Sequence, residues 1–154
     1  MSVELYLDEK LVVTGLKATT KEEVLETLSH KLFEEGSVKE AYIKAIVDRE
    51  KEYPTGLPST PPAIAIPHAN YDLVNKTSLA IATLETPVLF NNMEDKKNHI
   101  PVQIVIMMAI GEPHGQVEML QKIVSIIQDE AFRQKMLETT DPLKLIEMIK
   151  KFVL

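Results

Sequence analysis

Two long apolar runs in the middle of the chain most restrict the folds that it can adopt. Residues 78–84 read SLAIATL and residues 102–108 read VQIVIMM, with several β-branched side chains and no charged residue. A strand with one exposed face alternates polar and apolar residues, whereas these runs are apolar almost throughout. They are therefore predicted to be strands of a sheet that is covered on both faces.

Segments with helical periodicity lie before and after these runs. Residues 20–36 begin with the capping box Thr-Lys-Glu-Glu, continue with apolar side chains at helical spacing and end in glycine. Residues 37–52 begin with a second capping box, Ser-Val-Lys-Glu, and predict a second helix. Three more helices are predicted: one with its apolar face at 117–127, one at 130–137, and one over 141–152 that begins at an Asp-Pro pair.

The remaining segments complete the expected order of elements. Residues 3–13 are candidates for an N-terminal hairpin, and 63–66 for a short strand that a proline stops. The proline-rich stretch 54–62 predicts a loop with stiff bends, and 85–100 predicts a loop with a short strand at 88–90. Helices, then strands, then helices favour an α/β fold, in which helices cover a mixed β-sheet.

Length and composition exclude several classes of protein. A chain of 154 residues fits a single domain, which we expect over residues 1–154. The absence of cysteine excludes disulfides, cysteine-based zinc sites and a cysteine nucleophile, and it fits a reducing cytoplasm. A net charge of -6 argues against nucleic-acid binding. The acidic N-terminus does not resemble a signal peptide, and no apolar run approaches the about 20 residues of a membrane span, so we expect no membrane insertion.

Two of the four histidines stand where a fold of this kind places chemistry. His68 follows the short strand and a proline, so its backbone is expected to be held firmly while its ring reaches solvent. His114 stands at the predicted start of a helix, where free amides and the helix dipole favour an anion. From position alone, both remain open to the reading of a structural or merely exposed histidine. His30 and His99 are expected to be surface residues.

An arginine and the two histidines together suit the chemistry of phosphate. Arg49 lies at the end of the second predicted helix, and a guanidinium can bind phosphate oxygens bidentately. The position of Arg49 also fits an ordinary surface arginine. A histidine nitrogen can attack phosphorus, and positive groups stabilise the equatorial oxygens. No glycine-rich nucleotide loop is present, and His68 and His114 have no third metal ligand at a familiar spacing.

Three motifs in this order resemble one known family. The stretch Arg49-Glu-x-x-x-Pro-Thr-Gly-Leu57, followed by Ile64-Ala-Ile-Pro-His68, is similar to the phosphorylation-site signature of enzyme IIA proteins of the fructose–mannitol superfamily. These belong to the bacterial phosphoenolpyruvate-dependent sugar phosphotransferase system. The segment Pro113-His-x-Gln-x-x-x-Leu120 is similar to the second histidine motif of the family. The resemblance covers about residues 5–150. The spacing Ser59-Thr-Pro-Pro62 and the phrase Pro113-His-Gly-Gln-Val-Glu-Met-Leu120 look closest to the galactitol-specific branch.

The resemblance implies a fold, a reaction and partners. The family has a mixed sheet with helices on both faces, the fold of type-2 enzyme IIA and phosphotransferase–anion transport proteins. His68 matches the phosphorylated histidine, His114 its partner, and Arg49 the arginine that steadies the phosphoryl group. The donor would be the carrier HPr. The acceptor would be a cysteine or histidine of a cognate IIB component, which feeds the membrane permease. No cofactor or metal is implied, and the lack of cysteine fits a IIA chain whose IIB lies on another polypeptide.

Two other functions remain open on the sequence. The first is a regulatory phosphoprotein of the same fold, which takes phosphate but signals by binding proteins. The second is a hydrolase that uses His68 and His114 as acid and base. The apolar residues Leu57, Ile64 and Phe90 are candidates either for a docking surface or for the core.

Overall fold

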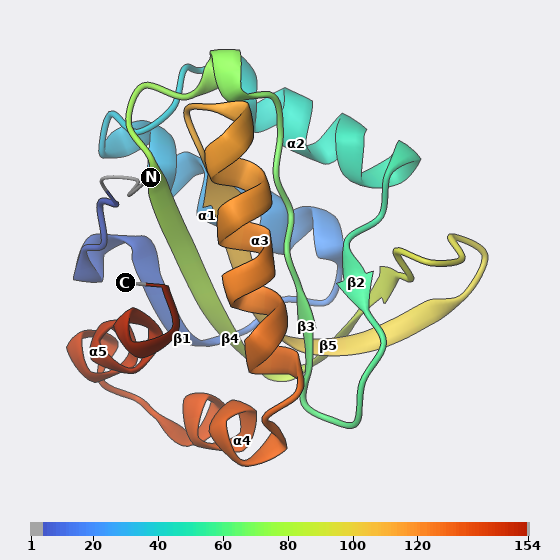
Figure 1. Ribbon diagram of the computed structural model, residues 1–154. Helices are drawn as coiled ribbons and strands as arrows, with labels where there is room; N and C mark the ends of the chain where they lie inside the picture. Colours follow the sequence, from blue (N-terminus) through green and yellow to red (C-terminus); the bar gives the residue numbers. More distant parts are fainter. Residues whose placement is uncertain (1–4, 154) are drawn as a thin grey trace.

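A mixed five-stranded sheet forms the centre of the protein. The computed structural model describes residues 5–153, and Figure 1 shows the sheet between two groups of helices. The strand order is β1-β4-β5-β3-β2; the β1–β4 and β3–β5 pairs are parallel, and the β4–β5 and β2–β3 pairs are antiparallel. The strands are β1 (Val12–Leu16), β2 (Gly56–Leu57), β3 (Ala63–Ala65), β4 (Ser78–Asn91) and β5 (His99–Ala109).

Helices cover both faces of this sheet, which confirms the predicted α/β fold. One face carries α1 (Lys21–Glu34) and α2 (Ala41–Glu52). The other carries α3 (Pro113–Ile127), α4 (Glu130–Glu138) and α5 (Pro142–Val153), with α3 running across the sheet in Figure 1. Two short 3-10 helices, Glu9–Leu11 and Tyr71–Leu73, lie in the connections.

The apolar run of β4 shows why both faces must be covered. Successive side chains of a strand point to opposite faces. Ala80 and Ala82 accordingly join the core beneath α1 and α2, while Leu79 and Ile81 join the core beneath α3 and α5. The small alanines allow α1 to approach the sheet closely, and neither face of the strand is left to water.

Local signals at the helix ends agree with the sequence at three places. The hydroxyl of Thr20 accepts the amide of Glu23 at 3.2 Å, as the capping box predicts, although the Glu23 carboxylate reaches back to Thr19. Gly36 has a φ of 75°, which ends α1 in the left-handed conformation that glycine adopts without strain. Asp141 accepts the amide of Leu143 at 3.1 Å and begins α5.

Three expectations about local structure were wrong. The second capping box does not form, because the hydroxyl of Ser37 is buried and accepts a bond from Ser78 at 2.7 Å; α2 begins only at Ala41. No N-terminal hairpin forms among residues 5–13, since β1 pairs in parallel with β4; residues 3 and 4 lie outside the described part of the chain.

The third concerns the predicted loop at 85–100. β4 and β5 extend through most of it as one long hairpin, in which Val88 pairs with Val102 and Asn91 with His99. The expected short strand at 88–90 is present as the outer part of β4. Across residues 5–153, no helix combines the length and the apolar character needed to cross a membrane.

Candidate functional site

His68 lies just beyond β3, in a segment that is bonded on both sides. The amide of Ile66 donates to the carbonyl of Thr55 at 3.1 Å, and the amide of Met108 in β5 donates to the carbonyl of Pro67 at 2.8 Å. The backbone before the histidine is therefore fixed by two neighbouring segments. The side chain of His68 is half-buried, so the ring is held by protein on one side and reaches the surface on the other.

The ring of His68 has one nitrogen engaged. Its Nδ1 lies 2.9 Å from the carbonyl oxygen of Ile66. A carbonyl only accepts, so Nδ1 carries the proton and donates it, and Nε2 keeps its lone pair. Burial lowers the pKa of His68 most; the Ile66 bond raises it, and the charge of Arg49 lowers it further, with a net lowering from 6.5. The ring is therefore largely neutral near pH 7.

Arg49 lies near the C-terminal end of α2, and its charge acts on the His68 ring. Its guanidinium carbon stands 5.2 Å from the centroid of the Tyr53 ring, in a cation–π arrangement. The Nε atom of Arg49 is buried, and within residues 5–153 it has no hydrogen-bond partner. A buried donor without a partner is costly, and here it belongs to the side chain that the sequence assigns to phosphate. The structure thus brings Arg49 and His68 together.

His114 is placed differently. It is the second residue of α3, is exposed, and lines a hollow with Val117, Glu118 and Gln121. No hydrogen bond joins His114 to His68 or Arg49 in the described part of the chain. The first turn of α3 nevertheless reaches the His68 segment, because Gln116 donates its side-chain amide to the carbonyl of Ala69 at 3.1 Å. The expected pairing of His114 with His68 therefore stays a prediction.

The His68 ring opens into a hollow that we call the His68 hollow. It lies between the end of α2, the start of β2 and the tip of the β4–β5 hairpin. Besides His68, its lining includes Tyr53, Thr55, Met93, Glu94 and Lys96. Both acidic and basic side chains border the ring, together with an aromatic and a thioether side chain.

Sequence reasoning missed Glu50, which is buried beside this site. Its two carboxylate oxygens accept the backbone amide and the hydroxyl of Thr55, both at 2.8 Å. Burial raises the pKa of Glu50 to about 7, against the lowering effect of the Thr55 bonds and Lys21; Glu22 adds a small rise. The spacing of a glutamate five residues before the threonine of a turn was the available signal, and it lay inside the quoted motif.

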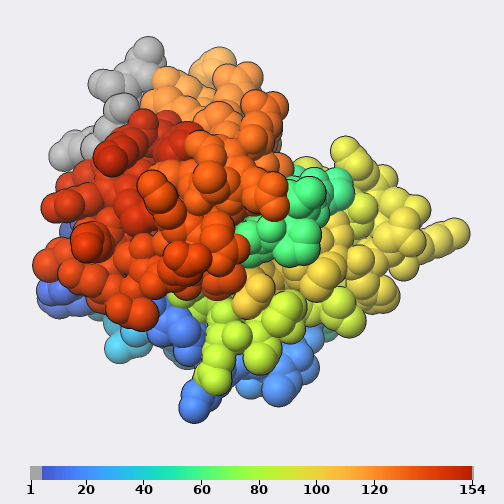
Figure 2. Space-filling view, turned by 90° about the horizontal axis from the view of Figure 1, so that it is seen from below, coloured from blue at the N-terminus to red at the C-terminus, as the bar shows by residue number. Residues whose placement is uncertain are grey.

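Arg133 was also missed, and it holds the proline-rich loop. This α4 side chain is buried; its Nε donates to the carbonyl of Pro62 at 3.1 Å, and its Nη2 donates to the carbonyl and hydroxyl of Thr60 at 3.0 and 2.7 Å. Figure 2 shows this loop, in green, against the orange surface of α4. The connection between β2 and β3 is thereby attached to the C-terminal helices.

The other candidates fall outside the site. His30 and His99 are exposed, as expected. Leu57, Ile64 and Phe90 are buried and belong to the core rather than to a docking surface. Over residues 5–153, no group of three or more His, Asp or Glu side chains is arranged to hold a metal ion.

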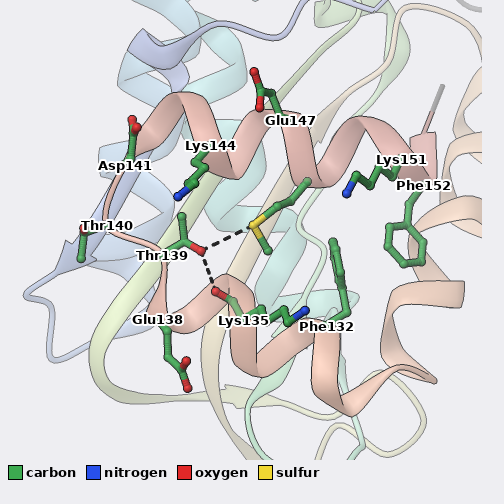
Figure 3. Close-up of a pocket in the computed structure, with 11 residues that line it drawn as sticks. Phe132, Lys135, Glu138, Thr139, Thr140, Asp141, Lys144, Glu147, Lys151 and Phe152 are labelled. Atoms are coloured by element: carbon green, nitrogen blue, oxygen red, sulfur yellow. Dashed lines mark hydrogen bonds between the residues drawn. The ribbon is translucent and has the colours of Figure 1, made fainter.

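A further hollow lies between α4 and α5, away from these residues. Figure 3 shows Phe132 and Phe152 at one end of it, with ring centroids 4.4 Å apart, and Glu138, Thr140 and Asp141 at the other. Neither His68, His114 nor Arg49 lines it. Its lining has equal numbers of lysines and acidic residues, so its charge favours no class of ligand.

Comparisons with known proteins agree on one family. The family described as "Phosphoenolpyruvate-dependent sugar phosphotransferase system, EIIA 2" matches residues 5–152. A mannitol-specific EIICBA component of this system from Pasteurella multocida is 32% identical over 147 residues, which make up 94% of this chain and 22% of that protein. The chain thus spans about a fifth of the length of that relative.

Two further likenesses extend over nearly the whole of both chains. The galactitol-specific EIIA component of Escherichia coli (strain K12) is 26% identical over 143 residues, 93% of this chain and 94% of that one. In the complex of enzyme IIAMTL and phosphorylated enzyme IIBMTL from Escherichia coli, a matched chain is 27% identical with a TM-score of 0.78, covering 96% of this chain and 99% of that one. The chain therefore belongs to the EIIA 2 family of the phosphoenolpyruvate-dependent sugar phosphotransferase system.

Proposed function

We propose that this chain accepts a phosphoryl group from phospho-HPr on Nε2 of His68 and passes it to a cognate IIB component. Membership of the EIIA 2 family supports a phosphocarrier role. The observation that carries the assignment to this atom is the bond from Nδ1 of His68 to the carbonyl of Ile66. It leaves a neutral nitrogen with a free lone pair on the side of the ring away from the strand.

The reaction is a direct displacement. The lone pair of His68 Nε2 forms the new N–P bond while the P–N bond to the HPr histidine breaks, and the HPr ring keeps that electron pair. The proton on Nδ1 of His68 remains on its bond to Ile66 throughout. Little proton movement is needed, so the protein acts by holding the groups in position and by balancing charge. Transfer to IIB reverses these roles, with His68 as the leaving group.

Arg49 and His114 are proposed to bind the phosphoryl oxygens. The unpartnered Nε of Arg49 gives the guanidinium a donor to offer, and its charge already acts on the His68 ring. His114 would approach from the start of α3, where the free amides of the first turn also favour an anion. Its exposure leaves the side chain free to rotate toward a bound group.

The choice of partner and sugar belongs to the same proposal. The Escherichia coli complex of enzyme IIAMTL with phosphorylated enzyme IIBMTL supports a IIB acceptor. The galactitol-specific relative, which matches over almost its full length, supports galactitol or a related hexitol as the transported substrate. We propose in addition that residues 1–154 act as one domain, in the cytoplasm.

Phosphorylation by the purified donor system tests this proposal. Incubation with phosphoenolpyruvate, enzyme I and HPr should add the mass of one phosphoryl group to the intact protein. His68→Ala should remove this addition, whereas His99→Ala, which changes an exposed histidine on β5, should keep it. Labelling of the His68→Ala variant would contradict the assignment. Onward transfer is then measured with a candidate IIB component as acceptor.

A further inference from the structure

Two side chains of the site belong to different elements, and their relative position must be kept for transfer. Arg49 is carried by the last turn of α2, whereas His68 is carried by the segment after β3. Between them lies the stretch 53–57, which leaves the helix at Tyr53 and enters β2 at Gly56. A shift of this stretch would change the distance between the guanidinium and the ring, and transfer reactions respond strongly to such shifts.

We propose that Glu50 is a positioning residue for phosphoryl transfer, which clamps the helix end carrying Arg49 to the segment that holds the His68 ring. The inference rests on the proposed function. Glu50 neighbours Arg49 in sequence, but its side chain turns inward and is buried. It has no place in the reaction itself.

A continuous set of bonds leads from Glu50 to the acceptor ring. The carboxylate of Glu50 accepts both the amide and the hydroxyl of Thr55, each at 2.8 Å. The carbonyl of Thr55 accepts the amide of Ile66 at 3.1 Å. The carbonyl of Ile66 in turn accepts Nδ1–H of His68 at 2.9 Å. The clamp therefore sets the position of the carbonyl that decides which nitrogen of the ring is free.

The far side of the Thr55 segment is closed as well. A Cβ placed on Gly56 would lie 2.7 Å from the carbonyl oxygen of Asn91, so the backbone there touches the end of β4. The amide of Met93 donates to the carbonyl of Gly56 at 2.8 Å. The segment is thus enclosed between Glu50 and the β4–β5 hairpin, and loss of the Glu50 bonds would free the side that faces Arg49.

The charges around Glu50 indicate that it positions Thr55 by its hydrogen bonds and not by its charge. Lys21 and Glu22 on α1 act on it with opposite sign, and the Lys21 amine itself is bonded to the side-chain oxygen of Asn91. No ion pair involves Glu50 in residues 5–153. A neutral glutamine of the same shape can accept the Thr55 amide through its oxygen and donate to the Thr55 hydroxyl through its nitrogen. The position therefore needs the two bonds rather than the charge.

The test compares removal of the bonds with their replacement. Glu50→Ala should lower the rate constant of phosphorylation by phospho-HPr about 10-fold. Glu50→Gln should restore the rate to within about threefold of the original protein. Asp48→Ala is the matched control, because it removes an exposed carboxylate from the same helix next to Arg49, and it should leave the rate unchanged.

A spectroscopic measurement separates positioning from simple loss of stability. Nitrogen-15 spectra of the His68 ring should report one tautomer, protonated at Nδ1, in the original protein and in Glu50→Gln. Glu50→Ala should show a mixture of tautomers while the fold remains intact by circular dichroism. An unchanged rate and an unchanged tautomer in a folded Glu50→Ala would overturn the proposal.

A second pair of variants decides the matter if Glu50→Ala does not fold. Thr55→Val keeps the shape of the side chain and the backbone bond but loses the hydroxyl bond, and should transfer about threefold more slowly. Thr55→Ser should recover that loss, and equal rates for the two would overturn the proposal. Failure of the original protein to take phosphate on His68 would instead contradict the proposed function, because the ring tautomer is measured without any transfer.

Discussion

The two histidines of the candidate site differ in how firmly the fold holds them. The His68 segment is bonded to Thr55 and to β5, and its ring is bonded to the carbonyl of Ile66. The His114 ring stands exposed at the start of α3, and a side-chain hydrogen bond from Gln116 to the carbonyl of Ala69 connects that turn to the His68 segment. A group that must present one chosen nitrogen to two partners benefits from a fixed position. A group that only steadies charge tolerates freedom, so the difference suggests separate duties.

The largest effect is expected when the positive charge beside the fixed His68 ring is removed. Arg49→Ala should slow phosphorylation of His68 about 100-fold, because a charged donor aimed at the transferring group is lost. The pKa of His68 should rise at the same time, since the charge of Arg49 lowers it. Rapid-quench labelling gives the rate and ring NMR gives the pKa. Arg49→Lys serves as control, keeping the charge without the planar fork.

Removal of the free ring should have a smaller effect. His114→Ala should still accept phosphate, and onward transfer to a IIB component should slow about 10-fold, the equivalent of about 1.4 kcal/mol. Single-turnover transfer from the isolated phosphoprotein measures this step directly. If the variant accepts and passes on phosphate at the rates of the original protein, His114 has no part in the mechanism and is an ordinary exposed residue.

The hydrogen bond between the first turn of α3 and the His68 segment can be removed by itself. Gln116→Ala removes the bond to the carbonyl of Ala69 and should lower the acceptance rate about threefold or less, because the His68 ring keeps its other constraints. Gln121→Ala, which changes an exposed residue of the same helix, is the control. A loss as large as that of Arg49→Ala would show that α3 holds the acceptor ring more strongly than the bonds around β3 do.

The pH dependence of acceptance should be the mildest effect. A histidine in an unstructured peptide has a pKa of about 6.5 and would lose about half its neutral form between pH 7.5 and pH 6.5. His68 has a lowered pKa, so its neutral form persists further into acid, and the rate should fall by clearly less than half over this range. Labelling rates from pH 5.5 to 8 check this, after correction for HPr. A full twofold loss would contradict the shift.

The fold was predictable where local pattern decides and not where pairing decides. The apolar runs and the caps at Thr20 and Asp141 are properties of neighbouring residues, and they were interpreted correctly. The short strand at 88–90 was predicted, but its continuity with the rest of β4 was missed, because Glu85, Thr86 and Pro87 interrupt the pattern; β5 pairs with β4 from Asn91 back to Val88. The pairing of β4 with β5 joins residues far apart in the sequence, so the pattern of one segment cannot predict it.

The candidate site divides in the same way. His68 and Arg49 could be named from motifs, and the structure places them together, although their roles stay predictions. Glu50 lay inside a quoted motif, but its burial depends on how α2 packs and how Thr55 turns back toward it, so the motif alone did not assign it a place beside the site. Arg133 could not be found either, since the loop that it holds lies 71 residues away along the chain.

The tip of the β4–β5 hairpin bears on how the choice of partner proteins can change by mutation. Residues 92–98 form their own turn, in which Asn98 donates to the carbonyl of Asp95 at 2.9 Å and Glu94 donates to the side chain of Asn92 at 2.8 Å. Glu94 and Lys96 border the His68 hollow without contributing to the bonds that fix the ring, whereas the amide of Met93 also donates to the carbonyl of Gly56. The side chains of Glu94 and Lys96 at the mouth of the hollow are thus distinct from the bonds that fix the acceptor ring. Substitutions of side chains at the tip can therefore change which partner protein binds, while the chemistry of phosphoryl transfer is kept.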